Sequence, residues 1–107
     1  MRRGEIWWVE FDPTRGSEIR KRRPAVIVTA DGLNRGRRTV VVVPLSTSAR
    51  PYPPVVVPVA SAGPESVVVC DQLRAVDKSR LASKAGELTP ADLKSLSDSL
   101  RVVLATR

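Results

Sequence analysis

Valine clusters in short runs between turn-forming residues, and this pattern restricts the possible folds more than any other feature of the chain. The runs lie within residues 25–29, 39–44, 55–57 and 66–70, and proline or glycine stands close to each of them. β-Branched side chains suit a pleated, half-buried surface, so such runs are typical of strands. The longest apolar stretch, residues 40–45, is far shorter than the roughly 20 residues that a membrane-spanning helix needs. The sequence therefore predicts a small β-rich protein without a membrane span.

Three further segments have strand-like patterns, and one connecting segment does not. Residues 6–11 are a predicted first strand, residues 72–76 continue the fourth valine run past a bulge, and residues 82–88 form a final short strand. Residues 31–38 are either a basic turn or a short helical segment. The chain has 107 residues and no visible boundary, so we expect one domain over residues 1–107.

The end of the chain has the signals of an amphipathic helix at about residues 89–105. Thr89 is a suitable N-cap, Pro90 suits the first helical position, and Asp92 lies near the positive end of the helix dipole. The apolar residues that recur on one face are Leu93, Leu96, Leu100, Val103 and Leu104. Many short strands and one such helix predict a compact, strongly curved sheet or small barrel that carries the helix.

Positive charge is concentrated in the first half of the chain. The formal net charge is +7, from 18 basic and 11 acidic residues. Residues 1–50 contribute 11 basic and 5 acidic residues, a balance of +6, and residues 51–107 contribute 7 and 6, a balance of +1. Because neutralised phosphates release condensed counterions, this asymmetry indicates a polyanionic partner. The alternative is a basic surface that serves solubility alone.

The adjacent tryptophans Trp7 and Trp8 lie within the predicted first strand. Neighbouring side chains of a strand point to opposite faces, so one ring is expected in the core and the other outside it. The outward ring has three open roles: stacking on a nucleic-acid base, filling a subunit interface, or packing under a loop.

Four segments match one known family in order and spacing along nearly the whole chain. They are residues 3–18 (RGEIWWVEFDPTRGSE), 23–28 (RPAVIV), 41–47 (VVVPLST, followed by Tyr52-Pro53) and 70–77 (CDQLRAVD). Together they resemble the MazF/PemK (Kid) ribonuclease toxins. The resemblance implies an SH3-like barrel of antiparallel strands with a C-terminal helix, usually in a homodimer.

The same resemblance implies an activity and two macromolecular partners. The activity is sequence-selective cleavage of single-stranded RNA, without a metal ion or other cofactor, which leaves a 2′,3′-cyclic phosphate and a 5′-hydroxyl and inhibits translation. The partners are RNA and a MazE/PemI-like antitoxin whose acidic, flexible tail lies across the basic cleft of the toxin.

Arg23 is the first catalytic residue that the resemblance implies, because it matches the arginine before proline in the family's active site. Its guanidinium offers a planar fork of donors for phosphate oxygens. Ser46 matches the family's catalytic threonine or serine, and Thr47 is a neighbour able to share its role. Nothing in the sequence activates this hydroxyl as a nucleophile, and the alternative role of Ser46 is a turn cap. The chain has no histidine, so an imidazole acid–base pair is impossible.

Two carboxylates, Glu18 and Asp71, match acidic residues of the family. Either one is a candidate to accept the proton of the substrate 2′-hydroxyl. Asp71 has an alternative role as an ion-pair partner that orients Arg23 or Arg74.

Further basic residues are candidates for contacts with the RNA backbone. These predicted RNA-binding residues are Arg15, Arg20, Lys21, Arg22, Arg35 and Arg74, and Arg37 and Arg38 continue the second basic run. The alternative for each run is a solvated basic face. The chain departs from the PemK branch at Val69 and Ser17, where that branch has an arginine and a histidine.

Two other functions remain open on the sequence: a CcdB-like toxin that poisons DNA gyrase, and a non-catalytic SH3-like RNA-binding module. The Arg-Pro strand start and the Pro-Leu-Ser-Thr segment favour the ribonuclease over the gyrase poison.

The single cysteine, Cys70, cannot form an internal disulfide and is expected to be a small buried strand residue. No signal peptide is apparent, so the expected location is the cytoplasm.

Overall fold

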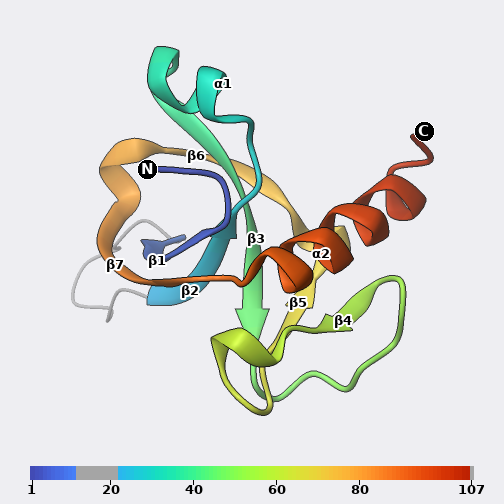
Figure 1. Ribbon diagram of the computed structural model, residues 1–107. Coiled ribbons are helices and arrows are strands. Elements are labelled where there is room, and N and C mark those ends of the chain that lie inside the picture. The colour runs from blue at the N-terminus through green and yellow to red at the C-terminus, as the bar shows by residue number, and fades with distance from the viewer. Residues whose placement is uncertain (12–21, 107) are drawn as a thin grey trace.

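The computed structural model describes residues 1–11 and 22–106. The strands are β1 (Glu5–Glu10), β2 (Arg22–Ile27), β3 (Thr39–Ser46), β4 (Val56–Pro58), β5 (Val67–Val69), β6 (Arg74–Asp77) and β7 (Leu81–Glu87). The helices are α1 (Asp31–Gly36) and α2 (Pro90–Val103), and three 3₁₀ turns are η1 (Ala60–Ala62), η2 (Cys70–Gln72) and η3 (Lys78–Arg80) (Figure 1). The predicted β-rich fold with a C-terminal helix is confirmed.

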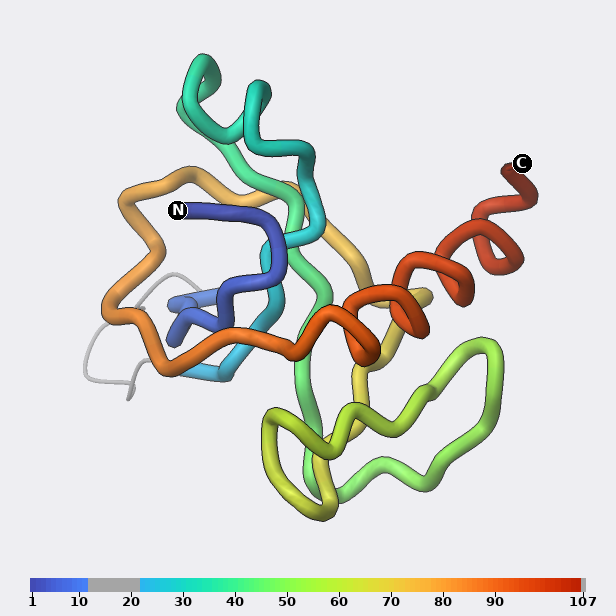
Figure 2. Tube along the Cα trace, viewed as in Figure 1, coloured from blue at the N-terminus to red at the C-terminus, as the bar shows by residue number. Residues whose placement is uncertain are grey.

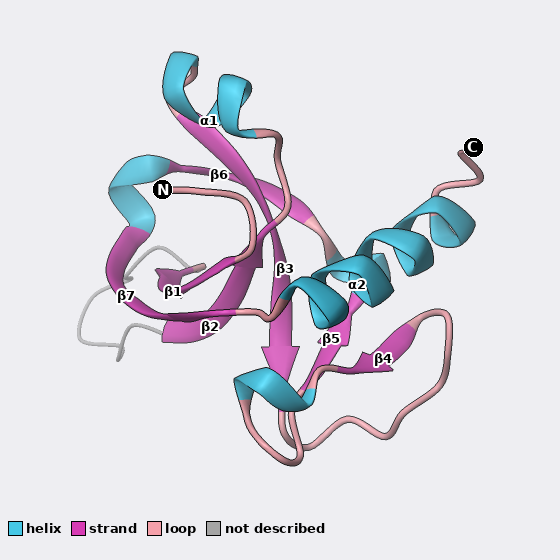
Figure 3. Cartoon of the chain, viewed as in Figure 1, coloured by secondary structure: helices cyan, strands magenta, loops and turns pink. Residues whose placement is uncertain are grey.

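The described strands form a single antiparallel sheet in the order β4-β5-β3-β2-β1-β7, and β6 pairs with β3 beside β5. The long strand β3 is central, because one edge pairs with β2 and the other edge pairs first with β6 and then with β5. As expected, β5 and β6 follow one another past an irregularity, which is the 3₁₀ turn η2. The cartoon shows β6 and β7 wrapping around the β1–β2 region (Figure 3).

The predicted barrel is not closed. Although η3 connects β6 directly to β7, β6 pairs with β3 and β7 pairs with β1, and no ladder between described residues joins the two. β7 also shifts register twice against β1, which is typical of bulges that bend a strand. The result is a strongly curved but open sheet.

Two hydrophobic clusters fill the two faces of this sheet. The first cluster lies between the sheet and α2, and its buried members include Ile6, Val26, Val43, Leu45 and Leu96. The second cluster lies on the other face, and its buried members are Val9, Phe11, Ala25, Ile27, Val40, Val42, Val76 and Leu81. Because alternate residues of β2 and β3 enter different clusters, the face to which any residue of these strands belongs follows from its position.

Strand β2 begins at Arg22, two residues before Pro24, where the sequence predicts its start. Pro24 pairs with Trp8 of β1, whereas pairing with β3 begins only at Ala25. Pro44 of β3 similarly falls between the segments that pair with β6 and with β5. Each proline thus lies where a ladder has a gap, which is where a strand tolerates the loss of an N–H donor.

Helix α2 follows the sequence expectation closely at its start. The Thr89 hydroxyl accepts a hydrogen bond from the backbone N–H of Asp92 at 3.3 Å, and Pro90 is the first helical residue. Leu96 is completely buried, and Leu93, Leu100 and Val103 pack beside it on the first cluster. Leu104 was expected on the same face, but it follows the last helical residue and is half-exposed. The chain trace shows β7 leading directly into α2 (Figure 2).

Neither α1 nor α2 is long and apolar enough to cross a membrane, and they are the only α-helices in the described part of the chain.

The buried carboxylate of Glu5 joins the first residues of the chain to β1 and β7. It accepts hydrogen bonds from the indole Nε1 of Trp7 at 3.0 Å and from the backbone N–H of Arg2 at 2.9 Å. It also forms a 3.1 Å ion pair with Lys84. Burial opposes ionisation, but these donors outweigh it and lower the pKa of Glu5 from 4.5 to about 2.

The stabilisation from Glu5 is therefore expected to depend on pH. Because the folded-state pKa lies below the unfolded value, the contribution is complete above about pH 4.5 and is lost as the pH falls toward 2. Glu5→Gln should lower the free energy of unfolding by up to about 3 kcal/mol at pH 7. Urea unfolding of both proteins at pH 7 and pH 3 measures this. An equal difference between the two proteins at both pH values would contradict the assignment.

Candidate active site

Arg23 and Ser46 occupy facing positions on adjacent strands. In the β2–β3 ladder Ala25 pairs with Pro44, and the same antiparallel register extended by two residues sets Arg23 opposite Ser46. Both belong to the face of the second cluster, since Ala25 and Ile27 of β2 and Val42 of β3 enter it at alternate positions. The two residues that the sequence implied from separate segments thus lie at the same end of two adjacent strands, just beyond the paired residues.

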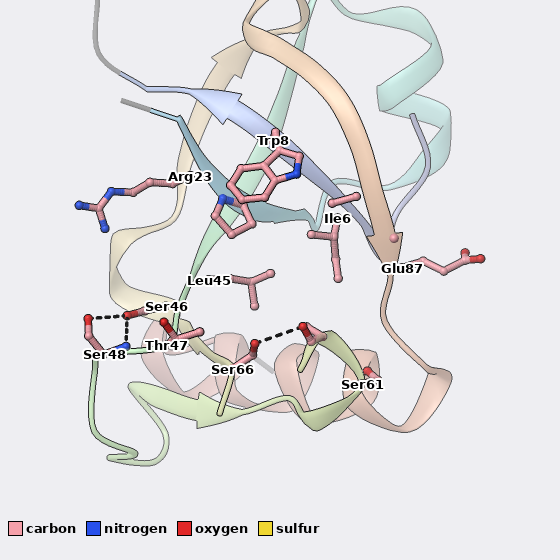
Figure 4. A pocket seen from close by; sticks show the side chains of 14 residues that line it. Ile6, Trp8, Arg23, Leu45, Ser46, Thr47, Ser48, Ser61, Ser66 and Glu87 are labelled. Carbon is pink, nitrogen blue, oxygen red and sulfur yellow. Dashed lines mark hydrogen bonds between the residues drawn. The ribbon is translucent and has the colours of Figure 1, made fainter. Parts of the chain in front are cut away.

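Two pockets adjoin this pair. The first has a volume of about 560 Å³ and is walled by Trp8, Pro24 and Leu45 together with Ser61, Ser66 and Glu87. The second, of about 680 Å³, is lined by Phe11, Asp71, Gln72 and Arg74 and by apolar residues of β3, β4 and β5. Arg23, Leu45 and Ser46 line both pockets, so the arginine and the hydroxyl lie where the two meet. Figure 4 shows the first pocket with the side chains of Arg23 and Ser46 on the same side of it.

The hydroxyl oxygen of Ser46 accepts hydrogen bonds from the backbone N–H groups of Ser48 at 3.2 Å and Ala49 at 3.1 Å. The Ser48 hydroxyl lies 3.3 Å from the same oxygen (Figure 4). The turn cap proposed as an alternative role is therefore present. It does not exclude a role in the site, because an oxygen whose lone pairs are engaged by N–H donors keeps its proton free to donate. Thr47 is exposed and lines the first pocket but not the second.

Asp71 and Arg74 share the second pocket with Arg23. Asp71 lies in η2 and is exposed, and Arg74 is the first residue of β6. The guanidinium carbon of Arg74 lies 5.2 Å from the centre of the Phe11 ring, within the range of a cation–π interaction.

The other predicted site residues are placed differently or lie outside the described residues. Arg22 forms a 2.9 Å ion pair with Glu10. Arg35 lies in α1, before the start of β3, whereas Ser46 is at the opposite end of that strand (Figure 1). Arg35 is thus separate from both pockets. Glu18, Arg15, Arg20 and Lys21 fall in the part of the chain that the structure does not describe.

The two tryptophans divide as the alternation of a strand predicts. Trp7 packs against the second cluster, and Trp8 is 41 % exposed and forms part of the first pocket. Trp8 therefore lines a pocket, and its three possible roles stay predictions. Burial and the neighbouring charge of Asp71 raise the pKa of Cys70 to about 11, which suits a structural residue. The thiol is buried as expected, but Cys70 begins the 3₁₀ turn η2 and does not belong to a strand.

Sequence reasoning missed several residues that line the pockets. Phe11 was assigned only to the end of a strand, and Ser61, Ser66 and Glu87 were not singled out. Small hydroxyl residues in turns carry no pattern that distinguishes a pocket wall from a loop. For Phe11 a signal existed, since it keeps the alternation of Trp7 and Val9 and therefore shares their face.

The fold and the site together define a class: a small protein with an open antiparallel sheet, a C-terminal helix and an arginine–hydroxyl pair suited to binding a phosphate. Comparison with known proteins identifies the family. Residues 2–104 match the model of the PemK-like, MazF-like toxin of type II toxin–antitoxin systems. The chain belongs to this family.

Similar proteins cover almost the whole chain. It is 35 % identical to endoribonuclease MazF9 of Mycobacterium tuberculosis over 97 % of its own length and 96 % of that protein. It is 31 % identical to the endoribonuclease toxin MazF of Escherichia coli K12, over 94 % of its own length and 91 % of that protein. A solved MazE–MazF structure from Deinococcus radiodurans superposes with a TM-score of 0.83 at 27 % identity, covering 100 % of this chain and 98 % of the other.

Proposed function

We propose that this protein is the endoribonuclease toxin of a toxin–antitoxin pair, and that it cleaves single-stranded RNA in a sequence-selective, metal-independent reaction. The main support is the Arg23–Ser46 pair at the junction of two pockets. The names of the relatives MazF9 and MazF, both endoribonucleases, support the same activity.

The proposed reaction uses a nucleophile that the substrate itself carries. The ribose 2′-oxygen attacks the adjacent phosphorus, its proton leaves, and the bond from phosphorus to the 5′-oxygen breaks. The products are a 2′,3′-cyclic phosphate and a 5′-hydroxyl. The protein has to align the 2′-oxygen with the leaving oxygen, stabilise the negative charge on the phosphate, and assist the two proton transfers.

Arg23 and Ser46 are assigned to the charged phosphate. The guanidinium donates two parallel hydrogen bonds to non-bridging oxygens, and the Ser46 proton donates a third. An arginine remains protonated under ordinary conditions, so electrostatic stabilisation suits Arg23 better than general acid catalysis. A water molecule then protonates the leaving 5′-oxygen.

Two carboxylates remain candidates for the general base. Asp71 lines the same pocket as Arg23, which suits either proton acceptance or orientation of an arginine. Glu18 is a candidate because the family resemblance implies it. Arg15, Arg20 and Lys21 are proposed as RNA-binding residues because positive charge favours contact with the RNA backbone.

We infer an acidic antitoxin as the second partner. Relatives of this chain have been solved as an endoribonuclease with its cognate antitoxin from a mycobacterial species and as MazE–MazF complexes. An acidic antitoxin tail suits a net charge of +7 and would compete with RNA for the same arginines. A homodimer in the cytoplasm remains our expectation for the free toxin.

The decisive experiment is incubation of the purified protein with a long, defined, unstructured RNA in excess EDTA, followed by mapping of the cut ends. We expect discrete cuts with cyclic phosphate and 5′-hydroxyl ends. Loss of cutting in EDTA, with recovery on addition of a metal ion, would overturn the metal-independent scheme. Intact RNA with salt-sensitive binding would instead indicate the non-catalytic RNA-binding module.

A further inference from the structure

Phe11 and Arg74 meet although their strands are not neighbours in the sheet. Phe11 directly follows β1, Arg74 begins β6, and β2 and β3 lie between these strands in the sheet order. Curvature of the sheet brings the two side chains together on the face of the second cluster, where the guanidinium lies 5.2 Å from the ring centre. Phe11 is only 8 % exposed, so its ring is fixed in the packed core. The exposed side chain of Arg74 therefore contacts a rigid surface.

Arg74 opens into the pocket that Arg23 also lines, but from a different position along the sheet. Arg74 pairs with Val42 of β3, whereas the extended β2–β3 register sets Arg23 opposite Ser46. Val42 and Ser46 are four residues apart along β3, which corresponds to roughly 13 Å. Two guanidiniums anchored this far apart are spaced for different phosphates of one extended chain.

The contact with Phe11 also determines how Arg74 can bind. A guanidinium stacked on an aromatic ring has one face covered, and its N–H edge remains available for hydrogen bonds. An arginine restrained in this way loses less rotamer freedom when it binds an anion than a fully mobile one. Phosphate oxygens match the geometry of this edge, and RNA supplies a phosphate at each nucleotide.

We propose that Phe11 is a positioning residue that holds Arg74 as a second phosphate subsite, next to the scissile phosphate bound by Arg23 and Ser46. This inference rests on the proposed ribonuclease function and deepens it. The subsite requires a substrate with at least one phosphate besides the scissile one. Arg74 contributes to binding of the RNA and not to the bond-breaking step, so its loss should raise KM and leave kcat nearly unchanged.

The test is a double-mutant cycle with Phe11→Leu, Arg74→Gln and the double variant. The ligand is a fluorescent single-stranded RNA oligonucleotide made uncleavable by 2′-deoxy substitution at the mapped cut site, and affinity is measured by anisotropy at several salt concentrations. We expect each single substitution to weaken binding by roughly threefold to thirtyfold. The double variant should bind no more weakly than Arg74→Gln, because Phe11 acts through Arg74.

The salt dependence of RNA affinity distinguishes the loss of a positively charged group from the loss of its positioning. Arg74→Gln should reduce the slope of log affinity against log salt by about 0.7, the value for one phosphate contact on a single strand. Phe11→Leu should leave most of this slope in place because the cation is still present. Phe11→Tyr retains the ring and should restore near-normal affinity.

Loss of buried volume at Phe11 needs a matched control. Leu81 belongs to the same cluster and is equally 8 % exposed, so Leu81→Ala tests whether destabilisation of this cluster alone weakens binding. We expect Leu81→Ala to lower the unfolding midpoint and to leave RNA affinity within twofold of the wild type.

The outcomes distinguish this inference from the proposed function. If the wild type cuts RNA but Arg74→Gln binds with unchanged affinity and salt slope, the second subsite is wrong. If Phe11→Leu and Arg74→Gln weaken binding additively, Phe11 does not act through Arg74 and the positioning role is wrong. If the wild type cuts no RNA at all, it is the proposed function that fails.

Discussion

Arg23→Gln is expected to reduce the rate of RNA cleavage on the order of 10²- to 10³-fold, the usual effect of removing one preorganised donor from a developing oxyanion. The physical reason is that the Ser46 hydroxyl and the substrate are expected to remain in place, while the charge of the phosphate loses its cationic partner. Fold stability should change little because Arg23 is exposed. Single-turnover cleavage of a defined RNA measures the rate, and urea unfolding verifies the fold.

Two companion variants give this prediction its specificity. Arg23→Lys keeps the positive charge but loses the planar fork, so we expect activity between the wild type and Arg23→Gln. Arg101→Gln removes an exposed arginine near the end of α2, away from both pockets, and should cut RNA at the normal rate. A folded Arg23→Gln protein with a rate within threefold of the wild type would remove Arg23 from the active site.

Leu96→Ala is expected to lower the free energy of unfolding by about 2–5 kcal/mol. Leu96 is 0 % exposed and is the residue through which α2 enters the first hydrophobic cluster. Truncation removes favourable burial and leaves a cavity between the helix and the sheet, and a chain of 107 residues has a limited core to compensate.

Denaturant unfolding of Leu96→Ala beside Ser95→Ala measures this effect. Ser95 is the exposed neighbour on the same helix, and its replacement by alanine should be neutral or slightly stabilising, since alanine is the better helix former. A loss smaller than about 1 kcal/mol in Leu96→Ala would mean that the helix contributes little to the core. At temperatures where the variant stays folded, its cleavage rate should be close to normal.

The family resemblance implies that Arg23 and Ser46 belong to one site, and the structure places both residues on the walls of the same two pockets. The Ser46 hydroxyl acts as the turn cap that was the alternative to catalysis, and its position beside Arg23 keeps the catalytic role open. For Arg22 and Arg35 RNA binding stays a prediction. Both belong to basic runs that predict RNA contact, yet one is paired with Glu10 and the other is at the far end of β3.

The sequence by itself determined the local features of this protein. The valine runs predict the strands, and the Thr89–Pro90 signal predicts the start of α2, because strand and helix preferences act over a few neighbouring residues. The charge distribution also indicates a polyanionic partner without knowledge of the fold, because it follows from the residues that each half of the chain contains.

Only the tertiary structure decided how distant segments combine. The open sheet, the facing positions of Arg23 and Ser46, and the contact of Phe11 with Arg74 all depend on strand order, register and curvature. These are set by non-local pairing and by burial of both sheet faces, and a one-residue change of register would turn every side chain to the other face. Arg23 and Ser46 could therefore be named from the sequence, whereas their arrangement as a site results from folding.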